Sequence, residues 1–298
     1  MNTPVAALSR VESERLIRNP AVWVAFALTG WWLGVAMWGG PSIGSQPLTK
    51  YMLLLGYGFA VPGLVLFVAV VFAVLRGRME HTEELLGTLA VGNDRRSVAH
   101  ALANLGPAVV VMLTMLVMLA VIRPGASLGT DFDIDGVGAI DIPRPTVAQM
   151  LQGPVALLAF TTLAVALVRW IPTWLVIVPT PFFLIVQVAF FGLFVGTATS
   201  SANWLGVGGF LAHGVVNDEW VGCGEFDRRC DLPVSGFDRV TPWWHLGYLV
   251  ALAFLFGAIA VLRHRRDVRT WSAFGLGLAA AVSLAVVQAT TFQSFGTP

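Results

Sequence analysis

Charged side chains are scarce in this sequence. Asp, Glu, Lys and Arg make up 12% of the 298 residues, whereas hydrophobic residues make up 56%. Soluble domains contain about 25% charged residues. A soluble fold of this length cannot hide so much apolar surface, so the composition excludes a soluble globular protein. The formal net charge is only +1, and nothing in it indicates nucleic acid as a partner.

Motifs for nucleotide, metal and covalent chemistry are also missing. The only lysine is Lys50, which follows Thr49 and not a glycine, so no GxxxxGK[ST] phosphate-binding loop exists. The sequence contains no HExxH or CxxC pattern, and its five histidines are scattered along the chain. We therefore predict no catalytic residue, no metal site and no cofactor in the chain itself.

Long apolar runs dominate what is present. A membrane-spanning helix needs about 20 apolar residues, and these runs are too long and too uniformly apolar to be strands of a barrel. The prediction is an all-α integral membrane protein: a single transmembrane domain, 1–298, built as a bundle of six to seven transmembrane helices. The runs cover residues 21–40, 51–75, 105–122, 153–168, 174–195, 243–262 and 271–290, of which the fourth is the shortest.

The basic residues between the runs predict an orientation, because cytoplasmic segments retain positive charge. With the N-terminus inside, 12 of the 18 basic residues are cytoplasmic and 6 are outside. Segments 123–152 and 196–242 become outer loops, and the C-terminus is outside if the seventh run crosses. Residues 1–20 contain acids and no cleavage site, so we expect the first run to act as the insertion signal. The predicted location is the cytoplasmic membrane, with several crossings.

The interiors of the runs contain essentially no ionisable side chains, which argues against a proton-coupled or ion-coupled transporter. The remaining polar groups are expected to form hydrogen bonds between helices, with substrate contact as the alternative. These groups belong to Thr114, Thr161, Thr162, Gln187 and Gln288.

Two features of the outer loops raise the question of cross-links and metal ions. Cys223 and Cys230 are the only cysteines and both lie in loop 196–242, where oxidation is permitted, so we predict a disulfide between them. Residues 131–136, DFDIDG, match the opening of a calcium loop, but Ile142 occupies the place of the last acidic ligand and helices are not expected on either side. We expect a solvated acidic loop; calcium binding is the alternative.

The predicted cytoplasmic connection 76–103 has the pattern of two short helices. Acidic residues lead into an amphipathic stretch that should end near Gly92, and a second helix should begin around residues 94–97 and continue into the third membrane helix. A short helix with charge and leucine on its surface suits a groove on another protein, and an amphipathic turn at the membrane surface is the alternative. The predicted contacts with a partner are Glu83, Glu84, Leu85, Leu86, Leu89, Arg95 and Arg96.

This connection resembles the coupling loop of type-2 ATP-binding cassette (ABC) exporter permeases, which lies between their second and third spans. The resemblance is carried by Glu80, by EELLGTLAV at 83–91 and by Arg95 with Arg96; His81 and Ala90 depart from the family pattern. The charged segment 9–20 looks like the connecting helix that precedes the first span in that family. The long loop 196–242 fits as well, and residues 203–214 resemble the family's short re-entrant helices. A seventh span is an addition to the usual six.

The resemblance implies that this chain is a permease subunit. ATP and Mg²⁺ would be bound by a separate ATPase subunit, and a second permease bundle, identical or different, would complete a path across the lipid bilayer. In the family the first, second and fifth spans line this path. Carried over to this sequence, the lining is apolar and aromatic, which indicates a hydrophobic or amphipathic cargo such as a lipid, lipopeptide or drug. The implied pathway residues are Trp31, Trp32, Phe59, Phe182, Phe183, Gln187 and Phe190.

Two other functions remain open. A membrane scaffold or sensor that does not transport would also combine outer loops for a ligand with cytoplasmic loops for a regulator. An intramembrane enzyme fits least well, because the runs contain no pairing of a nucleophile with a base.

Overall fold

The computed structural model describes residues 4–38, 58–79, 92–121, 129–132, 139–142, 145–171, 175–176, 235–237 and 241–294. Within these ranges the chain is largely helical, as predicted. The helices are α1 (Pro4–Arg18), α2 (Pro20–Trp38), α4 (Gly58–Met79), α6 (Asn93–Ala103), α7 (Leu105–Val121), α8 (Val147–Trp170), α11 (Thr241–Leu262) and α12 (Val268–Thr291).

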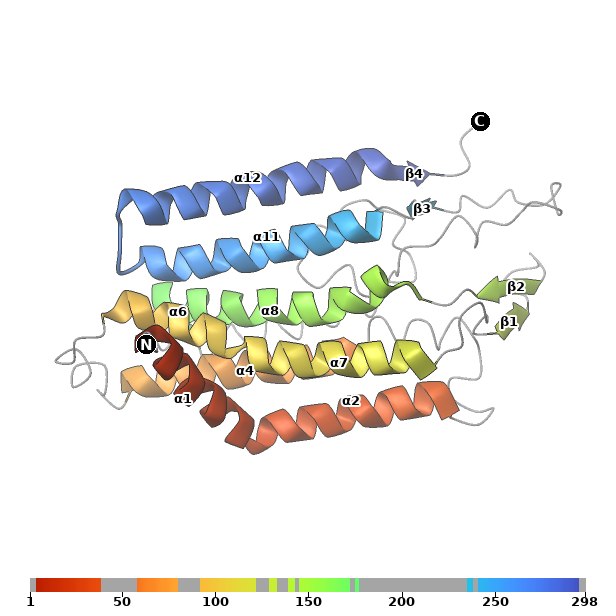
Figure 1. Ribbon diagram of the computed structural model, residues 1–298, viewed down its shortest axis with the longest axis horizontal. Coiled ribbons are helices and arrows are strands. Elements are labelled where there is room, and N and C mark those ends of the chain that lie inside the picture. The colour runs from red at the N-terminus through yellow and green to blue at the C-terminus, as the bar shows by residue number, and fades with distance from the viewer. Residues whose placement is uncertain are drawn as a thin grey trace.

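The long helices lie side by side along the longest axis of the molecule, and α1 crosses them obliquely at one end (Figure 1). Within the described ranges, four helical segments are long and apolar enough to cross a membrane. These are Asp94–Val121, which joins α6 to α7, and Val147–Trp170, Trp243–Leu262 and Val268–Gln288. The helical class predicted from the sequence is therefore confirmed, and these four segments support a membrane-embedded protein. Most of the fifth run, 174–195, lies outside the described residues.

Two short pairs of strands lie at the end of the bundle opposite α1 (Figure 1). The antiparallel pair β1 (Gly129–Phe132) and β2 (Ala139–Ile142) places Asp131 opposite Ile140. The start of the acidic stretch, Asp131 with Phe132, is thus part of a strand. The second pair joins β3 (Ser235–Phe237) to β4 (Phe292–Ser294), so the residues that follow α12 lie beside residues 235–237. The sequence did not predict either pair.

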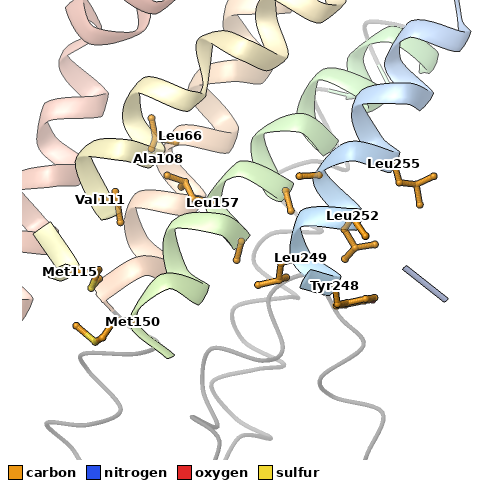
Figure 2. Close-up of a cluster of buried hydrophobic side chains, with 14 of the residues drawn as sticks. Leu66, Ala108, Val111, Met115, Met150, Leu157, Tyr248, Leu249, Leu252 and Leu255 are labelled. Carbon is orange, nitrogen blue, oxygen red and sulfur yellow. The ribbon is translucent and has the colours of Figure 1, made fainter. Parts of the chain in front are cut away.

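The centre of the bundle is α8, which packs against α4, α7 and α11, while α12 packs on the outer side of α11. In the candidate membrane-spanning part of α8, 67% of the residues are buried, compared with 17% in that of α12. Figure 2 shows the apolar core between α4, α7, α8 and α11. Lipid chains are as apolar as these side chains, so the contacts between the helices are stabilised mainly by close van der Waals packing.

The fourth run, predicted as 153–168, is longer in the structure. Helix α8 begins six residues earlier and has 24 residues. A capping box sets this start: Thr146 Oγ1 accepts a hydrogen bond from the amide of Gln149 at 3.3 Å, and Gln149 Oε1 accepts one from the amide of Thr146 at 2.8 Å. These bonds satisfy amide groups that a helix start leaves without partners. The predicted run missed this start because it was defined by apolar residues, and the first turn of α8 contains polar ones.

Candidate functional site

The basic residues of the described chain gather at one end of the bundle, called here the basic end. It comprises α1, the end of α4, the start of α6, the end of α8 and the turn between α11 and α12 (Figure 1). Segment 80–91 joins α4 to α6 at this end. The arginines are Arg10, Arg15, Arg18, Arg76, Arg78, Arg95, Arg96, Arg169, Arg263, Arg265, Arg266 and Arg269.

Helix α1 is attached to α6 by a specific polar contact. Ser13 Oγ donates a hydrogen bond to the backbone oxygen of Ala103 at 2.9 Å. The approach is close because Gly106 lacks a side chain: a Cβ at this position would lie 3.3 Å from Ser13 Oγ. The segment predicted to be a connecting helix is helical in the structure, as α1, and it packs against α6, the helix that follows segment 80–91.

A buried acid lies between α1 and α6. Glu12 is 8% exposed, and its Oε1 accepts a hydrogen bond from Arg15 Nη1 at 3.1 Å. Its other oxygen, Oε2, is 3.8 Å from Nδ1 of His100 on α6. Burial raises the pKa of the Glu12 carboxyl, and the charge of Arg15 and its hydrogen bond oppose this shift.

Two buried arginines complete the packing at the basic end. Arg169, near the end of α8, is 1% exposed, and Arg96, in the first half of α6, is 5% exposed. Both guanidinium groups, together with Arg15, lie within electrostatic reach of His100. Charges this deeply buried are rare unless they are paired. The junction of α1, α6 and α8 is therefore a charged and densely packed joint.

The turn between α11 and α12 contacts the same region. Arg265 Nε donates to Asp267 Oδ2 at 2.8 Å, and its Nη1 is 3.5 Å from Asp94 Oδ2 at the start of α6. Asp267 also caps α12: its Oδ1 accepts from the hydroxyl of Thr270 at 2.6 Å and from the amide of Thr270 at 2.9 Å. These two bonds, assisted by Arg265, lower the pKa of the Asp267 carboxyl to about 2.

Of the predicted partner contacts, the structure describes Arg95 and Arg96. Arg95 is exposed at the start of α6, whereas Arg96 is buried against the chain itself. Arg95 is thus the one of this pair whose side chain is open to a partner. The other predicted contacts lie outside the described residues: Glu83, Glu84, Leu85, Leu86 and Leu89.

The predicted pathway residues are only partly described. Trp31 of α2 is 69% exposed, and Phe59 belongs to α4, the helix that packs against α2. Trp32 is in α2, but its side chain is outside the described part. Phe182, Phe183, Gln187, Phe190 and the cysteines Cys223 and Cys230 lie outside the described residues as well.

The polar groups inside the bundle behave in two ways. Gln288 forms the predicted contact between helices, because its Oε1 is 2.8 Å from His245 Nδ1 on α11. The same prediction is wrong for the three threonines, whose hydroxyls donate to carbonyl oxygens of their own helix three or four residues earlier. A threonine in a helix can always reach that carbonyl, which satisfies the hydroxyl without a second helix. These residues are Thr114, Thr161 and Thr162.

Sequence reasoning missed the joint formed by Glu12, His100 and Arg169. These residues are far apart along the chain, and each follows or precedes an apolar run as an ordinary flanking charge would. One available signal was the pair of acids Glu12 and Glu14 among the arginines of segment 9–20, since a carboxylate there compensates neighbouring arginines. Among the described residues, no group of three or more His, Cys, Asp or Glu side chains is placed to hold a metal ion.

Comparisons with known proteins identify no relative: no family model matches the chain, and no curated protein or solved structure matches it. The functional interpretation therefore depends on the residues and contacts of this chain.

Proposed function

We propose that this chain is the membrane-spanning subunit of an ABC exporter. In this proposal the basic end faces the cytoplasm, six or seven helices cross the membrane, and a separate ATPase subunit that binds ATP and Mg²⁺ contacts segment 80–91. A second bundle completes the path for a hydrophobic or amphipathic cargo. The observation that carries the proposal is the attachment of α6 to α1 directly after segment 80–91.

This attachment provides a mechanical route from the ATPase to the membrane. Helix α6 begins at Asn93 and continues almost directly into α7, since the amide of Ala108 bonds to the carbonyl of Asn104 across the junction. Asn104 Nδ2 also donates to the backbone oxygen of His100 at 3.0 Å, which stiffens the same turn. A displacement of segment 80–91 would therefore move α6, α7 and α1 together. Rigid elements of this kind transmit a local movement over long distances.

The distribution of charge supports the proposed orientation. All 12 arginines that the sequence predicts to be cytoplasmic belong to elements at the basic end (Figure 1). Positive residues in short connections favour the cytoplasmic side. The alternation of α2, α4, α7 and α8 between the two ends agrees with this arrangement.

The coupling role is tested by Leu86→Ala combined with Leu89→Ala. The purified chain, with the ATPase that co-purifies from its native membrane, is reconstituted in proteoliposomes, and complex formation and cargo-stimulated ATP hydrolysis are measured. We expect the double variant to insert normally, to bind the ATPase more weakly and to lose stimulated hydrolysis. Loss of buried apolar anchors at an interface typically costs more than loss of an exposed ion pair.

The matched control replaces Leu276 and Leu278 of α12, which are 69% and 43% exposed on the opposite flank of the bundle. This pair should leave association and hydrolysis unchanged. Glu83→Gln alone should have a mild effect. Normal association and hydrolysis in the Leu86, Leu89 variant would refute the coupling role, and co-purification of a kinase or transcription regulator in place of an ATPase would favour the scaffold function.

A further inference from the structure

A groove lies between α6, α8, α11 and α12 on the side of the bundle away from α2. Its volume is about 680 Å³, within the range of roughly 300 to 1,000 Å³ typical of ligand pockets. Leu158 and Thr162 of α8 contribute to its lining between the side walls, which come from α6 with the start of α7 and from α11 with the start of α12.

The lining of the groove has an apolar part and a charged part. Leu102, Leu105, Val250 and Phe254 line the apolar part, and they are between 40% and 52% exposed, so lipid chains of a surrounding bilayer have access to them. All of the charged lining residues lie at the basic end: Asp94, Arg95, Arg265, Asp267 and Arg269. A molecule that fills this groove must have a charged head and an apolar tail.

The charged part of the groove favours an anionic head. Both acids are engaged within the chain, because Arg265 contacts Asp94 and Asp267. The exposed guanidinium groups of Arg95 and Arg269 have no recorded hydrogen bond or ion pair among the described residues. Guanidinium groups bind phosphate through two parallel hydrogen bonds, and arginines at a membrane surface attract anionic lipids.

We propose that this groove binds one anionic phospholipid from the adjacent leaflet. The phosphate lies with Arg95 and Arg269, and an acyl chain follows the apolar part past Phe254 toward Val250. Bound there, the lipid connects α6 to α12 and so joins the helix after segment 80–91 to the last helix of the bundle. This inference requires a membrane-embedded chain but does not depend on the exporter function.

Gly257 allows the groove to be filled without disturbing the fold. It lies in the wall of the groove, and a Cβ placed on it would meet no atom within 4 Å. Gly275 of α12 has equally open surroundings but does not line the groove, so it provides the matched control. For the charged part, Arg95→Gln and Arg269→Gln are made as single variants. Their matched control is Arg266→Gln, which removes an exposed arginine outside the groove.

The experiment measures lipid retained by the purified full-length chain. Protein is equilibrated in mixed micelles containing phosphatidylglycerol or phosphatidylcholine, and bound lipid is counted by native mass spectrometry. We expect the unmodified chain to retain one phosphatidylglycerol in preference to phosphatidylcholine. The two arginine substitutions should each weaken this binding about five-fold, and Gly257→Phe should weaken it about ten-fold because it occupies the path of the acyl chain. Gly275→Phe and Arg266→Gln should bind as the unmodified chain does.

Equal retention of the two lipids by the unmodified chain would overturn the proposal, as would normal phosphatidylglycerol binding by Gly257→Phe. The oligomeric state is measured in the same spectra. If Gly257→Phe changes the oligomeric state and leaves lipid retention unchanged, the groove holds a helix of another copy and the lipid proposal fails. Thermal melting of each variant without added lipid separates a loss of binding from a loss of folding.

Discussion

His245 of α11 and Gln288 of α12 form a polar contact in the apolar bundle, with Nδ1 of the ring 2.8 Å from Oε1 of the amide, and both side chains are fully buried. Gln288 Nε2 donates to the backbone oxygen of Leu284 at 3.0 Å, which turns the amide oxygen toward the ring. His245 Nδ1 is therefore the donor in this contact. The bond ties the peripheral helix α12 to the bundle near the end opposite α1.

Replacing Gln288 with leucine removes the acceptor for His245 Nδ1 and should lower the stability of the protein. Hydrogen bonds between membrane helices average about 0.6 kcal/mol, and a donor left without an acceptor adds about 1 to 3 kcal/mol. His245→Phe combined with Gln288→Leu should recover part of this loss. The measurement is a double-mutant cycle by thermal denaturation in detergent. Strictly additive effects of the two substitutions would show that the contact contributes nothing.

Gly277 should not tolerate even alanine. A Cβ at this position would lie 3.1 Å from the backbone Cα of Leu255 and 3.1 Å from Phe254 on α11. Backbone atoms cannot move aside locally, so Gly277→Ala should force α12 away from α11 and destabilise the protein by about 1 to 3 kcal/mol. Gly275→Ala is the matched control because its surroundings are open, and it should be neutral or stabilising because alanine favours helix. Equal melting temperatures for the two variants would contradict this packing.

The hydrogen bond between Ser13 and the carbonyl of Ala103 should contribute about 0.5 to 1.5 kcal/mol to the attachment of α1. Ser13→Ala should therefore increase hydrogen exchange throughout α1 while leaving exchange in α8 unchanged. Ser9→Ala, one turn earlier on the same helix, is the control and should leave exchange in α1 as it was. Unchanged exchange in the Ser13 variant would show that α1 is attached by apolar packing alone.

The cap of α12 should depend on pH in the acid range. The pKa of Asp267 is about 2 in the folded protein, below its ordinary value of 3.8. A lowered pKa means that ionised Asp267 stabilises the folded state above about pH 4 and that this contribution disappears as the pH falls toward 2. Because the bond from the Thr270 hydroxyl is the largest single cause, Thr270→Val should reduce the pH dependence more than Arg265→Gln. Hydrogen exchange in the first turn of α12, followed from pH 5 to pH 2, tests this order.

The proposed orientation can be tested with single cysteines in intact cells after Cys223 and Cys230 are replaced by serine. Val268, next to the α11–α12 turn, is 82% exposed, so the protein itself does not shield a cysteine at this position from a thiol reagent on the same side of the membrane. With the basic end in the cytoplasm, Val268→Cys should not react with an impermeant thiol reagent. Ser235→Cys, in β3 at the opposite end, should react. Both should react after the membrane is permeabilised, and labelling of Val268→Cys in intact cells would reverse the orientation.

Much of the helical fold could be read from hydrophobicity. The first, third and sixth runs agree closely with α2, α7 and α11, because the apolar length of a helix is a local property of the chain. The second helix before α7 was also predicted, and α6 begins at Asn93, one residue before the predicted start at 94–97. The short strand pairs could not be predicted, since β3 and β4 are distant in sequence and each has three residues.

The sequence by itself therefore determined that the chain is apolar and largely helical, the approximate bounds of α2, α7 and α11, and which of its segments are basic. Only the tertiary structure decided which of those basic residues are buried: Arg95 and Arg96 are neighbours in sequence, yet α6 turns one outward and packs the other inside. It also decided that α8 is central and α12 peripheral, although both are apolar. The physical reason is that hydrophobicity is a property of single residues, whereas burial, ion pairing and grooves depend on which helix faces are brought together.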